Sequence, residues 1–216
     1  MVILYEIANT SISKMQSHLY KMSITNQNAI FWTAFPWENM EIIKSKEDKE
    51  KIIVTFRATS VQNLAEFVEK KKHRISYDDA IRLFLHLKNQ LEFLDAHQRS
   101  IASFALEDII VIDNRLFLDL NQDKVVVKDK KGNLEIIHPI KKDPFCAPEL
   151  CKASLPAYIP SQASFFSLAA LTTFCITNDT QKDYPKALES IWQTPLYWAL
   201  IRCLHKDPKN RYLLMI

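Results

Sequence analysis

Two aspartates of this sequence could together form a binding site for a cation. Asp108 and Asp119 flank a pair of short runs rich in isoleucine, leucine and valine. Carboxylate oxygens are the ligands that Mg²⁺ and Ca²⁺ prefer, so two aspartates facing each other could hold a divalent cation. The alternative is that Asp119 caps a turn and that Asp108 is a surface acid. We favour this alternative, because no partner residue that could anchor a nucleotide remains nearby.

The four cysteines show no spacing typical of a metal site. Cys146 and Cys151 are five residues apart, which is outside the usual spacing of a zinc-binding pair. No paired histidine follows them at the distance found in zinc fingers. We therefore predict that these two, together with Cys175 and Cys203, are the reduced thiols of a cytosolic protein.

Glycine is almost absent. Gly132 is the only one, where average usage would give about fifteen. A P-loop and a dinucleotide-binding fingerprint both need several glycines to bring backbone amides against phosphates. Both classes of nucleotide site are therefore excluded.

Charge and hydropathy indicate neither a membrane nor a nucleic acid as the partner. The net charge is only +3, and we find no charged-then-apolar leader and no apolar run approaching 18 residues. Residues 124–142 contain six lysines, which could bind an acidic partner or nucleic acid. Because no aromatic residues are interleaved with them, we predict a solvated face instead.

The elements that must position Asp108 and Asp119 begin with a small mixed region. Alternating apolar residues predict strands over residues 2–7, 29–35, 40–43 and 51–56, with a turn over 45–50. Ser11 or Ser13 could cap a short helix running through residues 14–22.

The apolar period then changes to 3.6 residues. It predicts a short helix over residues 61–68 and a longer one opened by Ser76, with Asp78 and Asp79 in its first turn. Two short strands follow over 109–112 and 115–120, then an irregular basic segment to 142 and helices after Pro148. This order predicts an α+β fold with two lobes joined near residues 57–60.

The stretch from Leu91 to Val111 resembles the catalytic loop of eukaryotic-type protein kinases, L-x-Y-L-H-x-x-x-I-x-H-R-D-L-K-P-x-N-I-L-I. Ser103 stands at the position of the catalytic Asp, Ala105 at that of the Lys, and Asp108 at that of the Asn. The apolar residues of the motif are kept, while the residues that do its chemistry are replaced.

Further landmarks follow in the family's order over residues 50–216. Asp119-Leu120-Asn121 resembles the metal-binding Asp-Phe-Gly, and residues 145–150 resemble the Ala-Pro-Glu motif. Residues 164–169 resemble the start of the central helix, with Ser164 in place of its Asp. Residues 203–211 resemble the C-L-x-x-D-P-x-x-R ending, which implies a buried ion pair between Glu149 and Arg211.

The resemblance implies a protein-kinase-like fold with a reduced N-lobe of a few strands and one helix over residues 1–57. A mostly helical C-lobe would occupy residues 58–216. It also implies a chain that begins near the third strand of the family's N-lobe, without the glycine-rich hairpin or the Lys–Glu pair. Phosphoryl transfer depends on those parts, on magnesium and on an Asp that orients the hydroxyl.

We therefore expect a pseudokinase, an inactive binding or assembly module without a cofactor. The rival hypothesis is an atypical serine/threonine-type phosphotransferase that uses ATP and Mg²⁺ through Asp108 and Asp119. The ending of the chain also resembles kinase-like proteins of large DNA viruses, which implies a place in the virion or the host cytoplasm. The predicted partner is a protein, and it could dock on four aromatic residues, Phe31, Trp32, Phe35 and Trp37. The alternative is that these four side chains fill the core of the small lobe.

Overall fold

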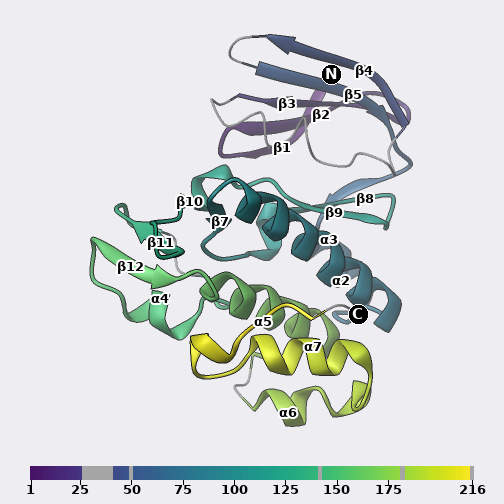
Figure 1. Ribbon diagram of the computed structural model, residues 1–216. Coiled ribbons are helices and arrows are strands. Elements are labelled where there is room, and N and C mark those ends of the chain that lie inside the picture. The colour runs from purple at the N-terminus through teal and green to yellow at the C-terminus, as the bar shows by residue number, and fades with distance from the viewer. Residues whose placement is uncertain (26–40, 49–50, 141–142, 181–182, 215–216) are drawn as a thin grey trace.

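A computed structural model describes residues 1–25, 41–48, 51–140, 143–180 and 183–214. The fold is α+β, as predicted (Figure 1). An antiparallel sheet formed by the N-terminal strands lies against a larger part that contains all the described helices. The predicted strand over residues 29–35 and the four aromatic residues of the proposed docking surface lie outside the described residues.

The N-terminal sheet has five strands in the order β1-β2-β3-β5-β4. Every neighbouring pair is antiparallel. The strands are β1 (Val2–Ile7), β2 (Thr10–Gln16), β3 (Leu19–Ile24), β4 (Glu41–Asp48) and β5 (Lys51–Arg57). In β5, Ile52, Val54 and Phe56 are buried while Lys51 and Arg57 are exposed. This alternation places one face of the sheet on an apolar core.

Two predictions for this region were wrong. Residues 11–22 form the hairpin of β2 and β3 rather than a helix, and the chain reverses at His18 with a φ of 60°. Alternation in β2 buries Ile12, so the strand period fits this segment better than the helical one. β4 also extends to Asp48, over most of the predicted turn at 45–50, because it pairs with β5 along that length.

The larger part begins with β6 (Val61–Asn63), α2 (Leu64–Lys70) and α3 (Tyr77–Ala96). The predicted helix over 61–68 therefore begins three residues later than expected, because Asn63 caps it by accepting a hydrogen bond from the Glu66 amide at 2.8 Å. α3 begins as predicted: the Ser76 hydroxyl accepts from the Asp79 amide at 3.1 Å. Its apolar stripe is buried against the rest of this part.

A hairpin of β8 (Ile109–Ile112) and β9 (Leu116–Asp119) separates two apolar cores. Every residue of both strands is buried, since each face of the hairpin meets a different core. Ile110 and Ile112 belong to the core under the N-terminal sheet. Ile109 and Val111 belong to the core of the helices. Figure 1 shows the hairpin between the sheet and the helices.

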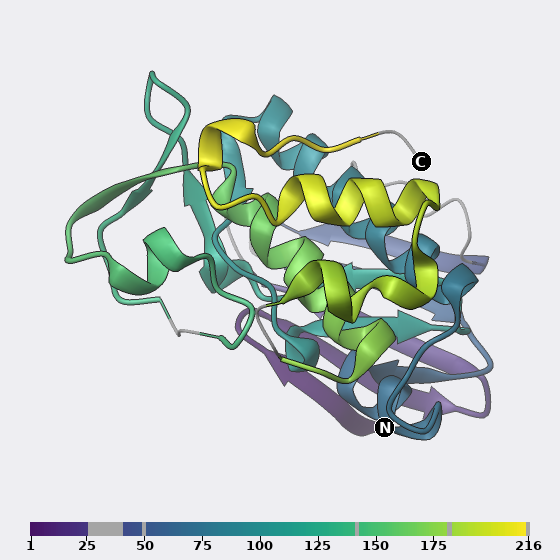
Figure 2. The same cartoon turned by 90° about the horizontal axis from the view of Figure 1, so that it is seen from below.

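The rest of the chain builds the helical layer seen from below in Figure 2. Its helices are α4 (Pro148–Lys152), α5 (Ala163–Thr177), α6 (Tyr184–Ala187) and α7 (Pro195–Cys203). α5 is buried along most of its length and contacts both α3 and α7.

The predicted irregular segment 124–142 contains two short strands. β10 (Val125–Val127) pairs with β7 (Arg99–Ile101), and β11 (Asn133–Ile136) pairs with β12 (Ala157–Pro160). Each of these strands is short and its partner lies far away in sequence, so the local pattern gives little indication of the pairing. Gly132, with a φ of +81°, lies in the turn that precedes β11.

Candidate functional site

A buried network of charges surrounds Lys124, between the end of β9 and the segment that leads to α4. The Lys124 ammonium lies 2.5 Å from Asp108 Oδ2 and 2.5 Å from Asp143 Oδ2. The Ser103 hydroxyl donates a hydrogen bond to the same oxygen of Asp143 at 3.0 Å. The side chains of Lys124 and Asp143 are each 3% exposed, and Ser103 is fully buried.

Helix α5 holds the segment that carries Ser103. The Ser164 hydroxyl, in the first turn of α5, donates to the Ile101 carbonyl at 2.6 Å. One turn later the Ser167 hydroxyl accepts from the Phe104 amide at 2.8 Å. Two bonds from one buried helix fix the segment on both sides of Ser103, and Ser164 therefore has a structural role.

The same segment is tied to Lys124 through the backbone, where the Ala102 amide donates to the Lys124 carbonyl at 2.9 Å. Ala105 follows as a buried residue before a 3₁₀ turn over Leu106–Asp108. Asp108 is thus carried to the network at the end of a short turn. Its backbone carbonyl accepts from the Leu120 amide at 2.9 Å, which joins this turn to the end of β9.

Asp119 lies at that end of β9 and is 3% exposed. Gln90 on α3 fixes its backbone with two bonds, donating to the Asp119 carbonyl at 2.9 Å and accepting from its amide at 3.1 Å. The Asp119 carboxylate accepts from the Asn121 amide at 2.8 Å through Oδ1. Its Oδ2 is buried without a hydrogen-bond partner in the described part of the chain.

Burial is the main cause of the raised pKa of Asp119. Removal from water, and then the nearby charge of Asp108, raise the pKa of Asp119 well above its usual value. Burial therefore favours the protonated form of Asp119, because the ionised form would lose its solvation without a compensating partner.

Lys124 is charged for the opposite reason. Burial alone would lower its pKa, but hydrogen bonds and charge from Asp108 and Asp143 outweigh that effect and raise it. The network then holds one ammonium against two carboxylates, with Asp119 beside them. The ammonium of Lys124 thus balances one of the two carboxylate charges from within the protein.

These residues do not fit the divalent cation considered for Asp108 and Asp119. The ammonium of Lys124 already occupies the space beside Asp108, and a cation there would have to displace it. The raised pKa of Asp119 also disfavours the ionised form that a cation would need. Among the residues that the structure describes, no three His, Cys, Asp or Glu side chains are grouped to hold a metal ion.

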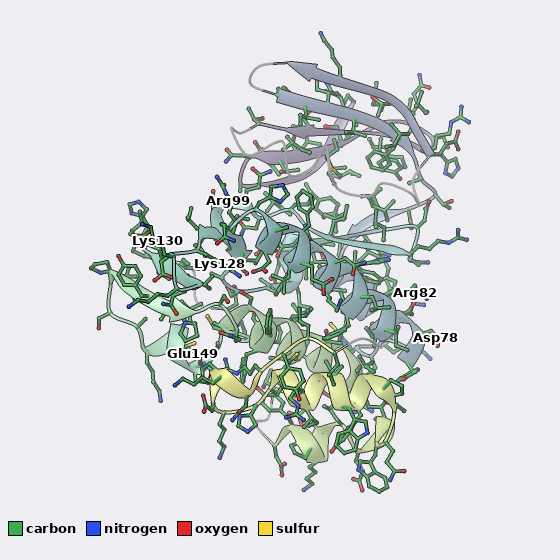
Figure 3. The ribbon with its side chains drawn as sticks, in the orientation of Figure 1. Asp78, Arg82, Arg99, Lys128, Lys130 and Glu149 are labelled. Atoms are coloured by element: carbon green, nitrogen blue, oxygen red, sulfur yellow. The ribbon has the colours of Figure 1, made fainter. Side chains whose placement is uncertain are left out.

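A second ion pair lies below the network, and it is the one expected from the sequence. The Arg211 guanidinium contacts Glu149 of α4 at 2.5 Å and 3.3 Å, one nitrogen to each carboxylate oxygen. The Arg211 side chain is fully buried, and it also donates to the carbonyls of His205 and Lys206. The pair ties α4 to the chain after α7, on the side where Figure 3 labels Glu149.

Sequence reasoning missed Lys124, Asp143 and Gln90 as members of the site. Lys124 belongs to the lysine-rich segment 124–142, which was predicted to be a solvated face, but among the lysines of this segment that the structure describes it is the buried one. Lys130 and Lys131 are exposed, and Figure 3 shows Lys130 projecting from the turn after β10. Nothing in the local sequence separates Lys124 from its neighbours, because its burial depends on Asp143, nineteen residues away.

Comparison of the sequence with models of known protein families and with curated proteins finds no match. Within the described ranges, no helix is long and apolar enough to cross a membrane.

Proposed function

We propose that this chain is a catalytically inactive protein-kinase-like protein, a pseudokinase, that acts as a binding or assembly module for another protein. In this proposal residues 1–57 form a reduced N-lobe and residues 58–216 a helical C-lobe of a two-lobed fold. The resemblance of the last residues to viral kinase-like proteins favours a place in a virion or in the host cytoplasm.

The observation that carries the proposal is the burial of the residues at the catalytic positions. Ser103 is fully buried, Ala105 is 4% exposed, and the Asp108 side chain is 14% exposed. Phosphoryl transfer requires Mg²⁺ on the phosphates and an acidic side chain that orients the attacking hydroxyl. A serine offers no carboxylate for that role, and its hydroxyl is already bound to Asp143.

The apolar core under the N-terminal sheet supports the same conclusion. In a two-lobed kinase the nucleotide lies between the lobes. Here Met22 and Phe56 from the sheet and Leu118 from β9 are fully buried members of one apolar cluster. A nucleotide at this junction would have to displace packed side chains, at a cost of several kcal/mol.

Two contacts support the family resemblance itself. The landmark residues Glu149 and Arg211 are 62 positions apart in sequence yet form a buried pair. Ser164, at the start of the proposed central helix, binds the backbone of the proposed catalytic loop. Chance matches of short motifs would not be expected to meet in this way.

A thermal-shift measurement with ATP and Mg²⁺ tests the proposal. We expect no change in Tm, because the proposal places a serine and an alanine where the catalytic Asp and Lys of a kinase would be. A bound nucleotide at a hundred times its Kd would add about 2.7 kcal/mol, which raises the Tm of a chain of this size by roughly 5–10 °C.

The rival hypothesis, an atypical phosphotransferase using Asp108 and Asp119, predicts such a shift. It also predicts that Asp119→Ala abolishes the shift. Asp123→Ala is the matched control, since Asp123 is an exposed acid four residues further on. A Tm rise seen in the wild type and the control but lost in Asp119→Ala would overturn the proposal.

A further inference from the structure

Two of the four cysteines lie together at the start of α4. Ala147 is the N-cap of this helix, so Cys146 immediately precedes the cap and Cys151 follows in the first turn. Side chains at these two positions commonly pack on each other. Here the Cys151 thiol contacts Cys146, donating to its carbonyl oxygen at 3.7 Å.

The pair is accessible from one side. Cys146 lines an apolar pocket of about 160 Å³ together with Ile136, Ile140 and Leu150. Cys151 is half-buried. The other two cysteines, Cys175 and Cys203, are fully buried. The four thiols thus differ in environment, and only Cys146 and Cys151 among them combine mutual contact with an opening toward solvent.

We propose that Cys146 and Cys151 form a modification site, a dithiol that a peroxide oxidises to a disulfide across the first turn of α4. The Cys151 sulfur attacks one peroxide oxygen and breaks the O–O bond, which releases one water and leaves a sulfenic acid. The Cys146 sulfur then attacks the Cys151 sulfur, and the hydroxyl leaves with the thiol proton as a second water. Two thiols lose two electrons, and the peroxide is reduced to two waters.

The order of the two steps follows from the environment. Burial, and then the neighbouring Cys151, raise the pKa of the Cys146 thiol to about 12. Cys146 is therefore protonated at neutral pH and is a poor first nucleophile. Cys151 is the more exposed of the two and reacts first, with Cys146 as the resolving thiol.

The disulfide would act on the ion pair between α4 and the end of the chain. The closed ring contains residues 146–151, and Glu149 lies within it. Since Glu149 holds Arg211, oxidation fixes the backbone on one side of this pair. The inference is independent of the proposed pseudokinase function, because it depends only on the two thiols and their surroundings.

The sequence provides a direct assay. Trypsin cleaves after Lys142 and Lys152, so both cysteines fall in one peptide, Asp-Pro-Phe-Cys-Ala-Pro-Glu-Leu-Cys-Lys. The full chain is treated with increasing hydrogen peroxide, unfolded, alkylated and digested. We expect this peptide to lose both alkyl groups and to be lighter than the reduced peptide by two hydrogen atoms. Cys175 and Cys203 should remain fully alkylated at the same peroxide concentration.

Two variants distinguish the first nucleophile, Cys151, from the resolving thiol, Cys146. In Cys146→Ser, Cys151 should accumulate as a sulfenic acid that dimedone captures. In Cys151→Ser, the oxidation of Cys146 should be at least tenfold slower. The peptide measurement on the wild-type chain does not depend on the folding of either variant, so it can decide the proposal by itself. Oxidation of a single cysteine to sulfinic acid without the disulfide, a disulfide between two chains, or equal loss of alkylation at Cys175 would overturn it.

Discussion

Asp119 illustrates how burial decides what an acidic residue can do. At the sequence level it is one of two candidate metal ligands. In the folded chain it is 3% exposed, and its backbone is fixed by Gln90 on α3. The groups that face it are Asp108, Lys124 and Asp143. An ionised carboxylate here would lose its solvation and face the like charges of Asp108 and Asp143, which the ammonium of Lys124 offsets only in part.

The first prediction concerns Asp119→Asn and pH. The folded-state pKa of Asp119 lies above its usual value of 3.8. As pH rises from that value toward the raised pKa, the unfolded chain releases this proton while the folded chain keeps it, so the free energy of unfolding falls. Asparagine does not titrate. The free energy of unfolding of Asp119→Asn, relative to that of wild type, should therefore rise with pH by up to about 1.4 kcal/mol per pH unit.

Urea unfolding at pH values from about 4 to about 8 measures this difference. Asp123→Asn is the control, because it makes the same substitution at an exposed aspartate four residues further on. A pH-independent difference for Asp119→Asn would mean that Asp119 is ionised in the folded chain.

At the scale of the element, the shortage of glycine means that other residues adopt positive φ values in the turns. Nine non-glycine residues in the described ranges have positive φ values. Among them, Asp113 and Asn114 form the turn between β8 and β9, and Gln98 follows the C-cap of α3. Asparagine and aspartate tolerate this conformation, but most other residues are strained in it by about 1 kcal/mol.

Gln98→Gly is therefore expected to stabilise the protein. Gln98 follows the C-cap of α3 with a φ of 56°, and it is exposed. Glycine adopts this conformation without the Cβ clash, so we expect the free energy of unfolding to rise by roughly 0.5–1 kcal/mol. Gln98→Ala shortens the side chain but keeps the Cβ, and it should give no gain. Equal stability of the two variants in thermal unfolding would contradict the argument.

The elements that the sequence predicts well are those with local signals. α3 has a capping serine, acids in its first turn and an apolar stripe, and it begins where predicted. Residues 14–22, which belong to the hairpin of β2 and β3, were predicted as a helix because the reversal at His18 has no glycine or Asn-Gly signal.

The residues of the candidate site also differ in how far the sequence alone could identify them. The favoured interpretation of Asp119 as the cap of a turn fits its bond from the Asn121 amide, whereas Asp108, predicted as a surface acid, is 14% exposed and contacts Lys124. Lys124 and Asp143 were not predicted, because their positions depend on pairings between distant segments such as β7 with β10. The physical reason is that a buried ion pair is specified by its tertiary surroundings and leaves no local pattern.

At the scale of the whole molecule, β8 and β9 make the two cores depend on each other. Ile110 and Leu118 complete the core under the N-terminal sheet, while Ile109 and Phe117 belong to the core of the helices. Loss of either core would expose one apolar face of a buried hairpin. Exposure of that face is unfavourable by about 25 cal/mol for each Å² of apolar surface. The two parts should therefore unfold together.

A pair of core variants tests this coupling. Ile12 is fully buried under the sheet and Leu87 is fully buried among the helices. Ile12→Ala and Leu87→Ala should each lower the free energy of unfolding by about 2–5 kcal/mol. Hydrogen exchange in increasing urea, followed by mass spectrometry, reports on β5 and α3 separately. We expect each variant to lower the protection of both elements, because opening of one core opens the other. If Ile12→Ala lowered protection in β5 and left α3 unchanged, the sheet would be an independent unit and the shared hairpin would not couple the two cores.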